Sequence, residues 1–301
     1  MKFHQIVVLD DIKIFDKIRL KIKNYSDSPI RVYNFDPKDD FETKERIMGA
    51  DCILVSWRTT INKEVLSAGR DLKFIFVCGT SIGGIDLEAC KKKKITVCNV
   101  VDYGDEGAVE FIVYQLLSLV RGFGRYKWKS FPAELNGKIL GIIGLGAVGK
   151  LLAETALGFK MKVLYNSKSR KIEMEKRGCR FVKKQELLQK SDIISLQTPR
   201  DVRILGKEDF GLMKGKILVN TTLGKAFKEK DFKDWIKRPN NFAIMDESTS
   251  PDFYKEFHNL ERVIFPKIYA GRTGESLTRL SEKVLYNISA CLAGKPINKV
   301  S

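Results

Sequence analysis

Residues 138–149, Lys-Ile-Leu-Gly-Ile-Ile-Gly-Leu-Gly-Ala-Val-Gly, carry the strongest structural signal in the chain. Gly144, Gly146 and Gly149 form a GxGxxG pattern between an apolar strand and a predicted helix over residues 150–157. The first glycine allows a tight turn, the second lets a pyrophosphate approach the backbone, and the third permits close packing of helix on strand. The stretch predicts a dinucleotide-binding βαβ unit. Its cofactor-binding residues would be Gly144, Gly146, Ala147, Val148 and Gly149.

The end of the next predicted strand, residues 162–171, indicates which dinucleotide binds. An NAD site usually places a carboxylate here, about 20 residues after the glycines, to accept hydrogen bonds from the ribose. This stretch holds no Asp or Glu, and Ser167 takes that place, followed by Lys168, Ser169 and Arg170. Hydroxyls and cations hold a 2′-phosphate that a carboxylate would repel. We therefore predict NADP rather than NAD, the alternative being a solvated basic loop. The predicted cofactor site also includes Thr198 and Pro199.

Short apolar strands alternate with helical patterns along almost the whole chain. Continuous β-branched and aliphatic runs separated by helices are typical of parallel sheets covered on both faces. The predicted strands form two series, residues 6–9, 52–55, 72–77 and 95–97, then 139–144, 162–165, 193–197, 217–220, 242–245 and 263–265. The sequence therefore predicts an α/β protein with two doubly wound parallel-sheet domains.

Helical patterns connect these strands. The predicted helices include residues 11–24, 61–67, 86–93, 107–121 and 274–293. We expect the last of them to return to the first domain. Residues 122–136 are irregular and basic, and we expect this segment to cross between the domains.

The composition indicates a folded protein without a membrane segment. With 301 residues the chain is long enough for two domains, and its 44% hydrophobic content excludes a disordered chain. The longest mainly apolar run, residues 111–120, is too short for a transmembrane helix, which needs about 20 residues. The first residues lead directly into a strand and lack the features of a signal peptide. We therefore expect a cytoplasmic protein.

The charge distribution and the numbers of cysteines and histidines indicate whether nucleic acid or a metal ion is expected to bind. The net charge of +17 is scattered along the chain, and its densest run, residues 91–94, ends a predicted helix, where cations are favourable. No zinc-finger or RNA-binding motif accompanies it, so we do not expect nucleic acid as a partner. The six cysteines form no CxxC pair and are predicted to be buried free thiols. Only two histidines are present, so no metal site is expected.

Several segments together resemble the D-2-hydroxyacid dehydrogenase family over nearly the whole chain. They are residues 66–75, 79–86, 99–110, 144–149, 191–196, 213–221 and 270–273. Residues 162–171 look most like the glyoxylate and hydroxypyruvate reductases that use NADP. The resemblance implies two Rossmann-like domains, with a nucleotide domain (103–274) inserted in a flavodoxin-like substrate domain (1–102 and 275–301). It also implies a homodimer.

The resemblance fails at the positions that carry catalysis. Family members exchange a hydride between the nicotinamide and C2 of a 2-hydroxy or 2-oxo acid, using an Arg, a His and a Glu that orients the His. This chain has Leu223 where the Arg belongs, Ser250 nearest the Glu position and Lys267 where the His belongs. Gly83 and Gly84 replace a common Asp-Asn in the substrate loop. Because a positioned general acid contributes about 10²–10⁴ in rate, we do not expect ordinary 2-oxo acid reduction by the family's mechanism.

Three interpretations therefore stay open. The first is an oxidoreductase with a rebuilt site for a small, anionic hydroxy or oxo substrate. The second is a cofactor-binding sensor or partner subunit without catalysis, and the third is a non-redox reaction through a transient ketone. For a rebuilt site, the candidate proton donors are Lys267 and Tyr269, the candidate anion-binding cations are Arg272 and Lys225, and the candidate backbone donors to a carboxylate are Gly79, Thr80 and Ser81.

Overall fold

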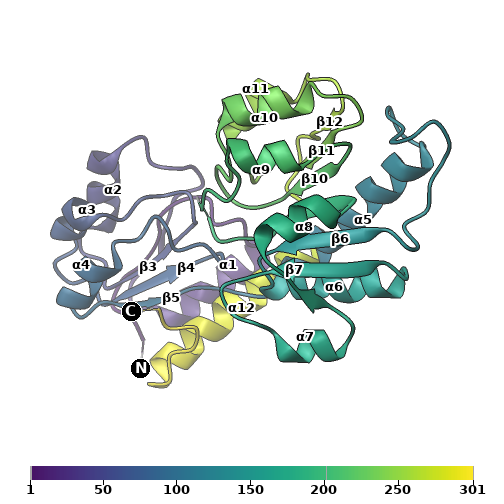
Figure 1. The fold of residues 1–301 in the computed structure, drawn as a ribbon. Coiled ribbons are helices and arrows are strands. Elements are labelled where there is room, and N and C mark those ends of the chain that lie inside the picture. The colour runs from purple at the N-terminus through teal and green to yellow at the C-terminus, as the bar shows by residue number, and fades with distance from the viewer. Residues whose placement is uncertain (1, 201, 301) are drawn as a thin grey trace. The chain divides into compact units, whose positions relative to one another are not determined.

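The structure is a computed structural model that describes residues 2–200 and 202–300. These residues form two compact units, each with its own parallel sheet (Figure 1). Unit 1 consists of the described residues up to Tyr103 and from Thr273 onward, and unit 2 consists of Gly104–Arg272. The predicted pair of parallel-sheet α/β domains is confirmed.

Unit 1 has the strand order β2-β1-β3-β4-β5, in which all neighbours are parallel. This is the flavodoxin-like order, in which the strand order reverses between β1 and β3 while all strands keep the same direction. The strands are β1 (Ile6–Val8), β2 (Arg31–Val32), β3 (Cys52–Val55), β4 (Phe74–Val77) and β5 (Thr96–Cys98). The helices are α1 (Asp16–Ile22), the 3₁₀ helix η1 (Lys23–Tyr25), α2 (Asp40–Ile47), α3 (Lys63–Ala68), α4 (Leu87–Lys92) and α12 (Gly274–Leu292).

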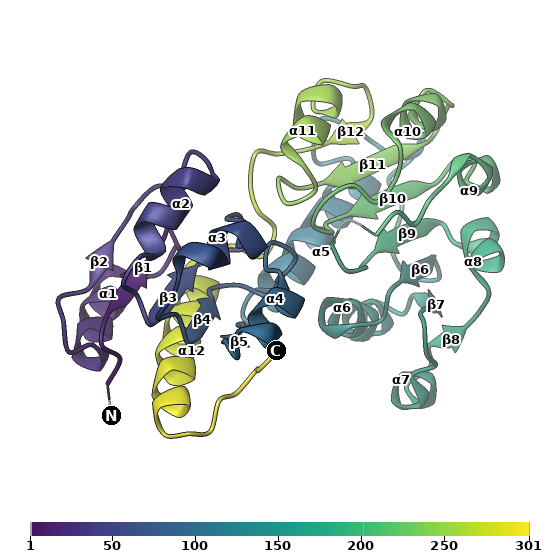
Figure 2. The ribbon, with the colours of Figure 1, turned by 90° about the vertical axis from the view of Figure 1, so that its left-hand side faces the viewer.

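Both faces of the unit 1 sheet are covered. Figure 2 shows α1 and α12 on one face and α2, α3 and α4 on the other. Along β3, Cys52 and Leu54 enter the core under α1 and α12, whereas Ile53 and Val55 enter the core under α2, α3 and α4. Because successive side chains of a strand point to opposite faces, a strand covered on both sides must be apolar throughout. This is why the apolar runs in the sequence identify the strands.

Unit 2 has the strand order β12-β11-β10-β9-β6-β7-β8, again with parallel neighbours. This is the Rossmann order with one further strand. The strands after β6 are added first on one side of it and then, from β9 onward, on the other, so the strand order reverses between β6 and β9. The strands are β6 (Ile139–Ile143), β7 (Lys162–Asn166), β8 (Arg180–Phe181), β9 (Ile193–Leu196), β10 (Ile217–Asn220), β11 (Phe242–Met245) and β12 (Val263–Ile264). The helices are α5 (Asp105–Arg121), α6 (Ala147–Gly158), α7 (Ile172–Lys176), α8 (Lys184–Lys190), α9 (Lys207–Leu212), α10 (Glu229–Ile236) and α11 (Pro251–Phe257).

Segment 122–136 does not cross between domains as expected. It lies within unit 2, where Trp128 and Leu135 are buried in the same core as α5 and α6. Its basic residues remain outside while these two apolar side chains fix it to the sheet. Among the described residues, none of the helices has the length and apolar content that crossing a bilayer would require.

Candidate functional site

In the turn between β6 and α6, close contacts within the chain require glycine at two of the three positions of the GxGxxG pattern. Gly144 has a φ of +97°, and a Cβ there would lie 2.0 Å from the Gln197 carbonyl oxygen at the end of β9. A Cβ on Gly149 would lie 2.3 Å from the Gly144 carbonyl oxygen. The Gly144 N–H donates to the Asn166 carbonyl at 2.8 Å, which ties the turn to the end of β7. Only glycine fits at these two positions.

Gly146 is different, because nothing in unit 2 requires it to be glycine. A Cβ at this position would meet no atom within 4 Å, and its φ of −82° suits any residue. Gly146 and Ala147 are exposed at the N-terminus of α6, where backbone N–H groups attract phosphate. The space in front of Gly146 therefore fits a pyrophosphate that approaches the backbone closely.

Polar groups at the ends of β9 and β10 border the same switch point of the sheet. The Thr198 hydroxyl is buried and has no hydrogen-bond partner among the described residues. The Gln197 side-chain amide donates to Ser195 Oγ at 3.0 Å and to Thr221 Oγ1 at 3.2 Å. Pro199 is exposed. Because a buried hydroxyl without a partner is costly, Thr198 is suited to contact a ligand bound at this edge.

The loop after β7 is fixed by contacts that the sequence did not reveal. Ser167 Oγ donates to the Ser169 carbonyl at 2.6 Å, whereas Lys168, Ser169 and Arg170 are exposed. The Arg170 guanidinium pairs with Glu175 on α7. This hydrogen bonding, together with that from the Tyr165 hydroxyl, lowers the pKa of Glu175 to about 2. The Ser167 hydroxyl is therefore used within the loop, and Arg170 is paired with a carboxylate that the sequence did not reveal.

Three of the candidate residues for a rebuilt site lie on one segment, residues 266–272. Buried Asp246, at the end of β11, accepts a hydrogen bond from the Ala270 N–H at 2.7 Å and fixes this segment. Burial raises the pKa of Asp246 to about 6. The Arg272 guanidinium lies 5.9 Å from the Tyr269 ring, so these two are brought together, and Lys267 is exposed.

Ser250, Leu223 and the candidate cation Lys225 lie in the loops after β10 and β11. Ser250 Oγ caps α11 by accepting hydrogen bonds from the N–H groups of Asp252 at 3.2 Å and Phe253 at 3.5 Å. Leu223 is half-buried in the loop after β10. Lys225 forms ion pairs with Glu229 at 2.9 Å and with Asp252 at 3.1 Å. The Lys225 side chain is therefore already engaged within unit 2.

In unit 1, the predicted carboxylate-binding loop follows β4. The Gly79 N–H already donates to the Val77 carbonyl at 2.9 Å, so it is not available as predicted. Thr80 Oγ1 donates to the Val100 carbonyl at 3.1 Å, and Asn99 Nδ2 donates to the Thr80 carbonyl at 2.8 Å. Among the described residues, the N–H groups of Thr80 and Ser81 have no acceptor. These two are the donors that remain for a carboxylate.

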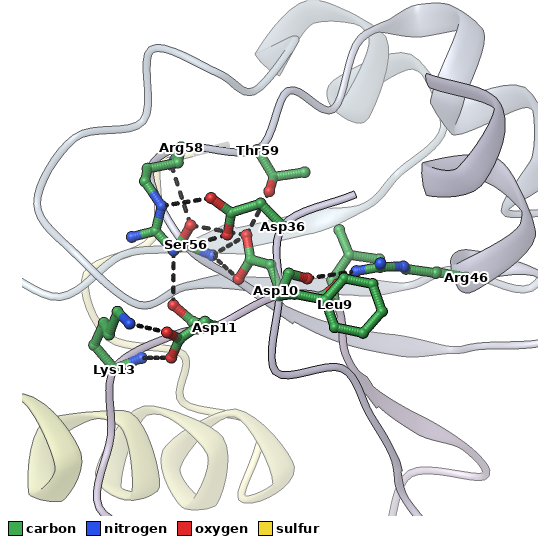
Figure 3. Close-up of polar contacts among 10 residues, drawn as sticks. Leu9, Asp10, Asp11, Lys13, Asp36, Arg46, Ser56, Arg58 and Thr59 are labelled. Atoms are coloured by element: carbon green, nitrogen blue, oxygen red, sulfur yellow. Dashed lines mark hydrogen bonds and ion pairs between the residues drawn. The ribbon is translucent and has the colours of Figure 1, made fainter. Parts of the chain in front are cut away.

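A buried carboxylate organises the neighbouring loops of unit 1 (Figure 3). Asp10, after β1, is inaccessible to solvent and accepts hydrogen bonds from the Ser56 N–H at 2.9 Å and from the Ser56 and Thr59 hydroxyls. Burial raises the Asp10 pKa. A Cβ on Gly84 would lie 2.8 Å from the Thr59 carbonyl oxygen, which explains glycine at this point of the substrate loop. No local pattern in the sequence indicates this network, because Asp10 and Ser56 meet only in the folded sheet.

Known proteins resemble the chain in both sequence and structure. Residues 116–265 match the family described as D-isomer specific 2-hydroxyacid dehydrogenase, NAD binding domain. A hydroxypyruvate reductase of Blautia hydrogenotrophica is 29% identical over 284 residues, which cover 86% of this chain and 88% of the relative. The chain belongs to the D-2-hydroxyacid dehydrogenase family.

Two further proteins are similar to the chain over most of its length. A glyoxylate reductase of Thermococcus litoralis is 29% identical over 289 residues, covering 85% of each chain. The solved structure of an acyclic imino acid reductase in complex with NADPH and D-Arg is 27% identical, with a TM-score of 0.87, and covers 99% of this chain and 100% of that one. The D-2-hydroxyacid dehydrogenase resemblance predicted from the sequence is confirmed, and unit 2 is its NAD(P)-binding domain.

Proposed function

We propose that this protein is an NADPH-dependent reductase of a small anionic 2-oxo substrate. When bound, NADPH would supply a hydride to the substrate carbon. In unit 2, Gly146 and the N-terminus of α6 would hold the pyrophosphate, while Lys168 and Arg170 would hold the 2′-phosphate. Ser167 would take part only if its hydroxyl gave up its hydrogen bond to the Ser169 carbonyl. The observation that carries the proposal is Gly146, because its missing side chain has no explanation within the chain.

The substrate would be held by groups that differ from those usual in the family. Within unit 1, the N–H groups of Thr80 and Ser81 are proposed to bind a carboxylate, and within unit 2, Arg272 is proposed to bind an anionic group. Tyr269 or Lys267 would provide the proton that a carbonyl oxygen must gain as hydride reaches its carbon. These residues would take over the functions of the family's catalytic residues, of which the Arg and Glu positions are occupied here by Leu223 and Ser250.

The test is to follow NADPH absorbance with glyoxylate, hydroxypyruvate and pyruvate. We expect turnover that is slower by about 10²–10⁴ than an Arg-His-Glu site would give, and that Tyr269→Phe or Lys267→Ala lowers kcat. Cofactor binding without turnover of any of these acids would instead support a cofactor-binding sensor. Release of a product without net NADPH consumption would support a reaction through a transient ketone.

A second candidate function is reduction of an imine of a 2-oxo acid. The solved relative acts on an acyclic imino acid and was captured with NADPH. A protonated imine already carries the proton on nitrogen, so hydride addition to carbon gives the neutral amine directly and needs no general acid. The absence of histidine from the segment around Lys267 would then be no handicap. Adding ammonium to pyruvate or glyoxylate should raise NADPH consumption if this function holds, and leave it unchanged otherwise.

We also propose that the protein is a cytoplasmic homodimer. Three large aromatic side chains on α5 and the segment after it are strongly exposed, Tyr114 at 66%, Phe123 at 78% and Phe131 at 81%. Exposed apolar groups of this kind mark protein interfaces. Sedimentation analysis should give a dimer, and replacing Phe123 and Phe131 by serine should give a monomer. The six free, buried thiols suit a reducing compartment.

A further inference from the structure

Arg170 is held by one edge of its guanidinium group. Its Nε donates to Glu175 Oε1 at 3.0 Å, and its Nη2 donates to Glu175 Oε2. This side-on arrangement uses the Nε–Nη2 edge and leaves the Nη1–Nη2 edge unused. Among the described residues, nothing bonds Nη1, and the guanidinium lies 6.0 Å from the Phe181 ring. A guanidinium fixed in this way presents its second edge to an incoming ligand.

Glu175 is itself anchored to the sheet. It accepts a hydrogen bond at 2.7 Å from the hydroxyl of Tyr165, a β7 residue that is inaccessible to solvent. The same hydroxyl accepts from the Lys171 N–H at 2.7 Å, which closes the loop that carries Ser167 and Arg170. The hydrogen bonds from Arg170 and Tyr165 lower the Glu175 pKa to about 2, so the carboxylate stays ionised at neutral pH.

We infer that Glu175 is a positioning residue that holds Arg170 with its free edge open to the 2′-phosphate of NADPH. This inference rests on the proposed NADPH function. An arginine side chain loses much rotamer freedom when it binds a phosphate, and fixing it beforehand removes part of that cost. A carboxylate near a phosphate is otherwise repulsive. Any benefit of Glu175 to phosphate binding must therefore act through Arg170, and that dependence can be tested.

The test compares two fragments of the cofactor, 2′,5′-ADP and 5′-AMP, by calorimetric titration of the full chain. We expect the wild type to bind 2′,5′-ADP about tenfold or more tightly than 5′-AMP. The 2′-phosphate adds at least one hydrogen bond between charged groups, and one such bond lowers Kd by about that factor. Arg170→Ala should remove most of this preference, and Glu175→Ala should reduce it by about three- to tenfold. Binding of 5′-AMP should change by less than about twofold in either variant.

A double-mutant cycle distinguishes positioning from a general structural effect. If Glu175 acts only through Arg170, adding Glu175→Ala to Arg170→Ala should not weaken 2′,5′-ADP binding further. Glu173→Ala is the matched control, because Glu173 lies on the same helix but pairs with Lys150 at 2.9 Å. It should leave both affinities unchanged. Should Glu175→Ala fold poorly, Glu175→Gln keeps one acceptor for Arg170 and should show an intermediate loss.

The outcomes separate the inference from the function on which it rests. A wild type without preference for 2′,5′-ADP would overturn the NADPH proposal and this inference with it. A wild-type preference that Glu175→Ala leaves unchanged or strengthens would overturn the inference alone. Equal loss of both fragments would also overturn it, because it would mean that Glu175 only stabilises the fold.

Discussion

Gly146→Ala should separate cofactor binding from folding. No atom lies within 4 Å of a Cβ built at this position, and the φ of −82° is compatible with alanine. Replacing glycine by alanine stabilises a protein by about 0.4–1 kcal/mol through the unfolded chain, and alanine is a poorer helix cap by a similar amount. The free energy of unfolding should therefore change by less than about 1 kcal/mol.

Cofactor binding should respond much more strongly to the same methyl group. The methyl group would occupy the space in front of the α6 N-terminus and push the pyrophosphate away from the backbone N–H groups. Loss of one hydrogen bond to a charged group costs about 1.5–3 kcal/mol, which corresponds to a Kd that is higher by roughly 10- to 150-fold. The assays are urea unfolding and titration with NADPH on the same preparation.

Two neighbouring variants complete the comparison. Gly158→Ala, at the other end of α6, also meets no atom within 4 Å and should raise stability by about 0.4–1 kcal/mol while leaving binding unchanged. Gly144→Ala would place a Cβ 2.0 Å from a backbone oxygen at a φ of +97° and should lower stability by more than about 2 kcal/mol. If Gly146→Ala bound NADPH as tightly as the wild type, or lost stability as Gly144→Ala does, the account of the cofactor site would be refuted.

Three further changes test the rest of the structure. Burial raises the Asp246 pKa from 3.8 to about 6, so the folded state binds this proton more tightly than the unfolded state does. The Asp246 contribution to stability should fall by about 3 kcal/mol as pH rises from about 4 through 6, and urea unfolding of Asp246→Asn should lack this component. Gly271→Ala would place a Cβ 2.7 Å from the Gly104 carbonyl and should cost about 1–3 kcal/mol in urea unfolding, whereas Gly274→Ala, with no atom within 4 Å, should cost little. A thiol reagent should label none of the six buried cysteines in the native protein and all six after unfolding, and rapid native labelling would contradict their burial.

The fold could be predicted because its main strands are buried on both faces. Strands such as β3 and β6 are therefore continuous apolar runs, which the sequence displays directly. The edge strands β2 and β8 were missed, since each has only two residues and one of the two is an arginine, which breaks the apolar run. The placement of segment 122–136 was also mispredicted. Its apolar Trp128 stands alone in a basic stretch, and an isolated apolar residue does not indicate which core it enters.

The turn of the proposed cofactor site was predictable as far as it consists of backbone. Gly144 and Gly149 are needed for close approach within the chain, and their spacing follows from the geometry of the turn. Side chains that meet only through folding were not found. Glu175 reaches Arg170 from α7, and Asp10 meets Ser56 across two strands. No local pattern indicated either pair, and the hydrogen bond that occupies the Gly79 N–H was equally hidden.

The most direct test of the account is a side-by-side titration of the wild-type protein with NADPH and NADH under identical conditions. The open turn at Gly146 predicts that both cofactors bind, because each carries a pyrophosphate. The free edge of Arg170 predicts that NADPH binds at least about tenfold more tightly than NADH. Equal affinity, or tighter binding of NADH, would contradict the proposed 2′-phosphate site.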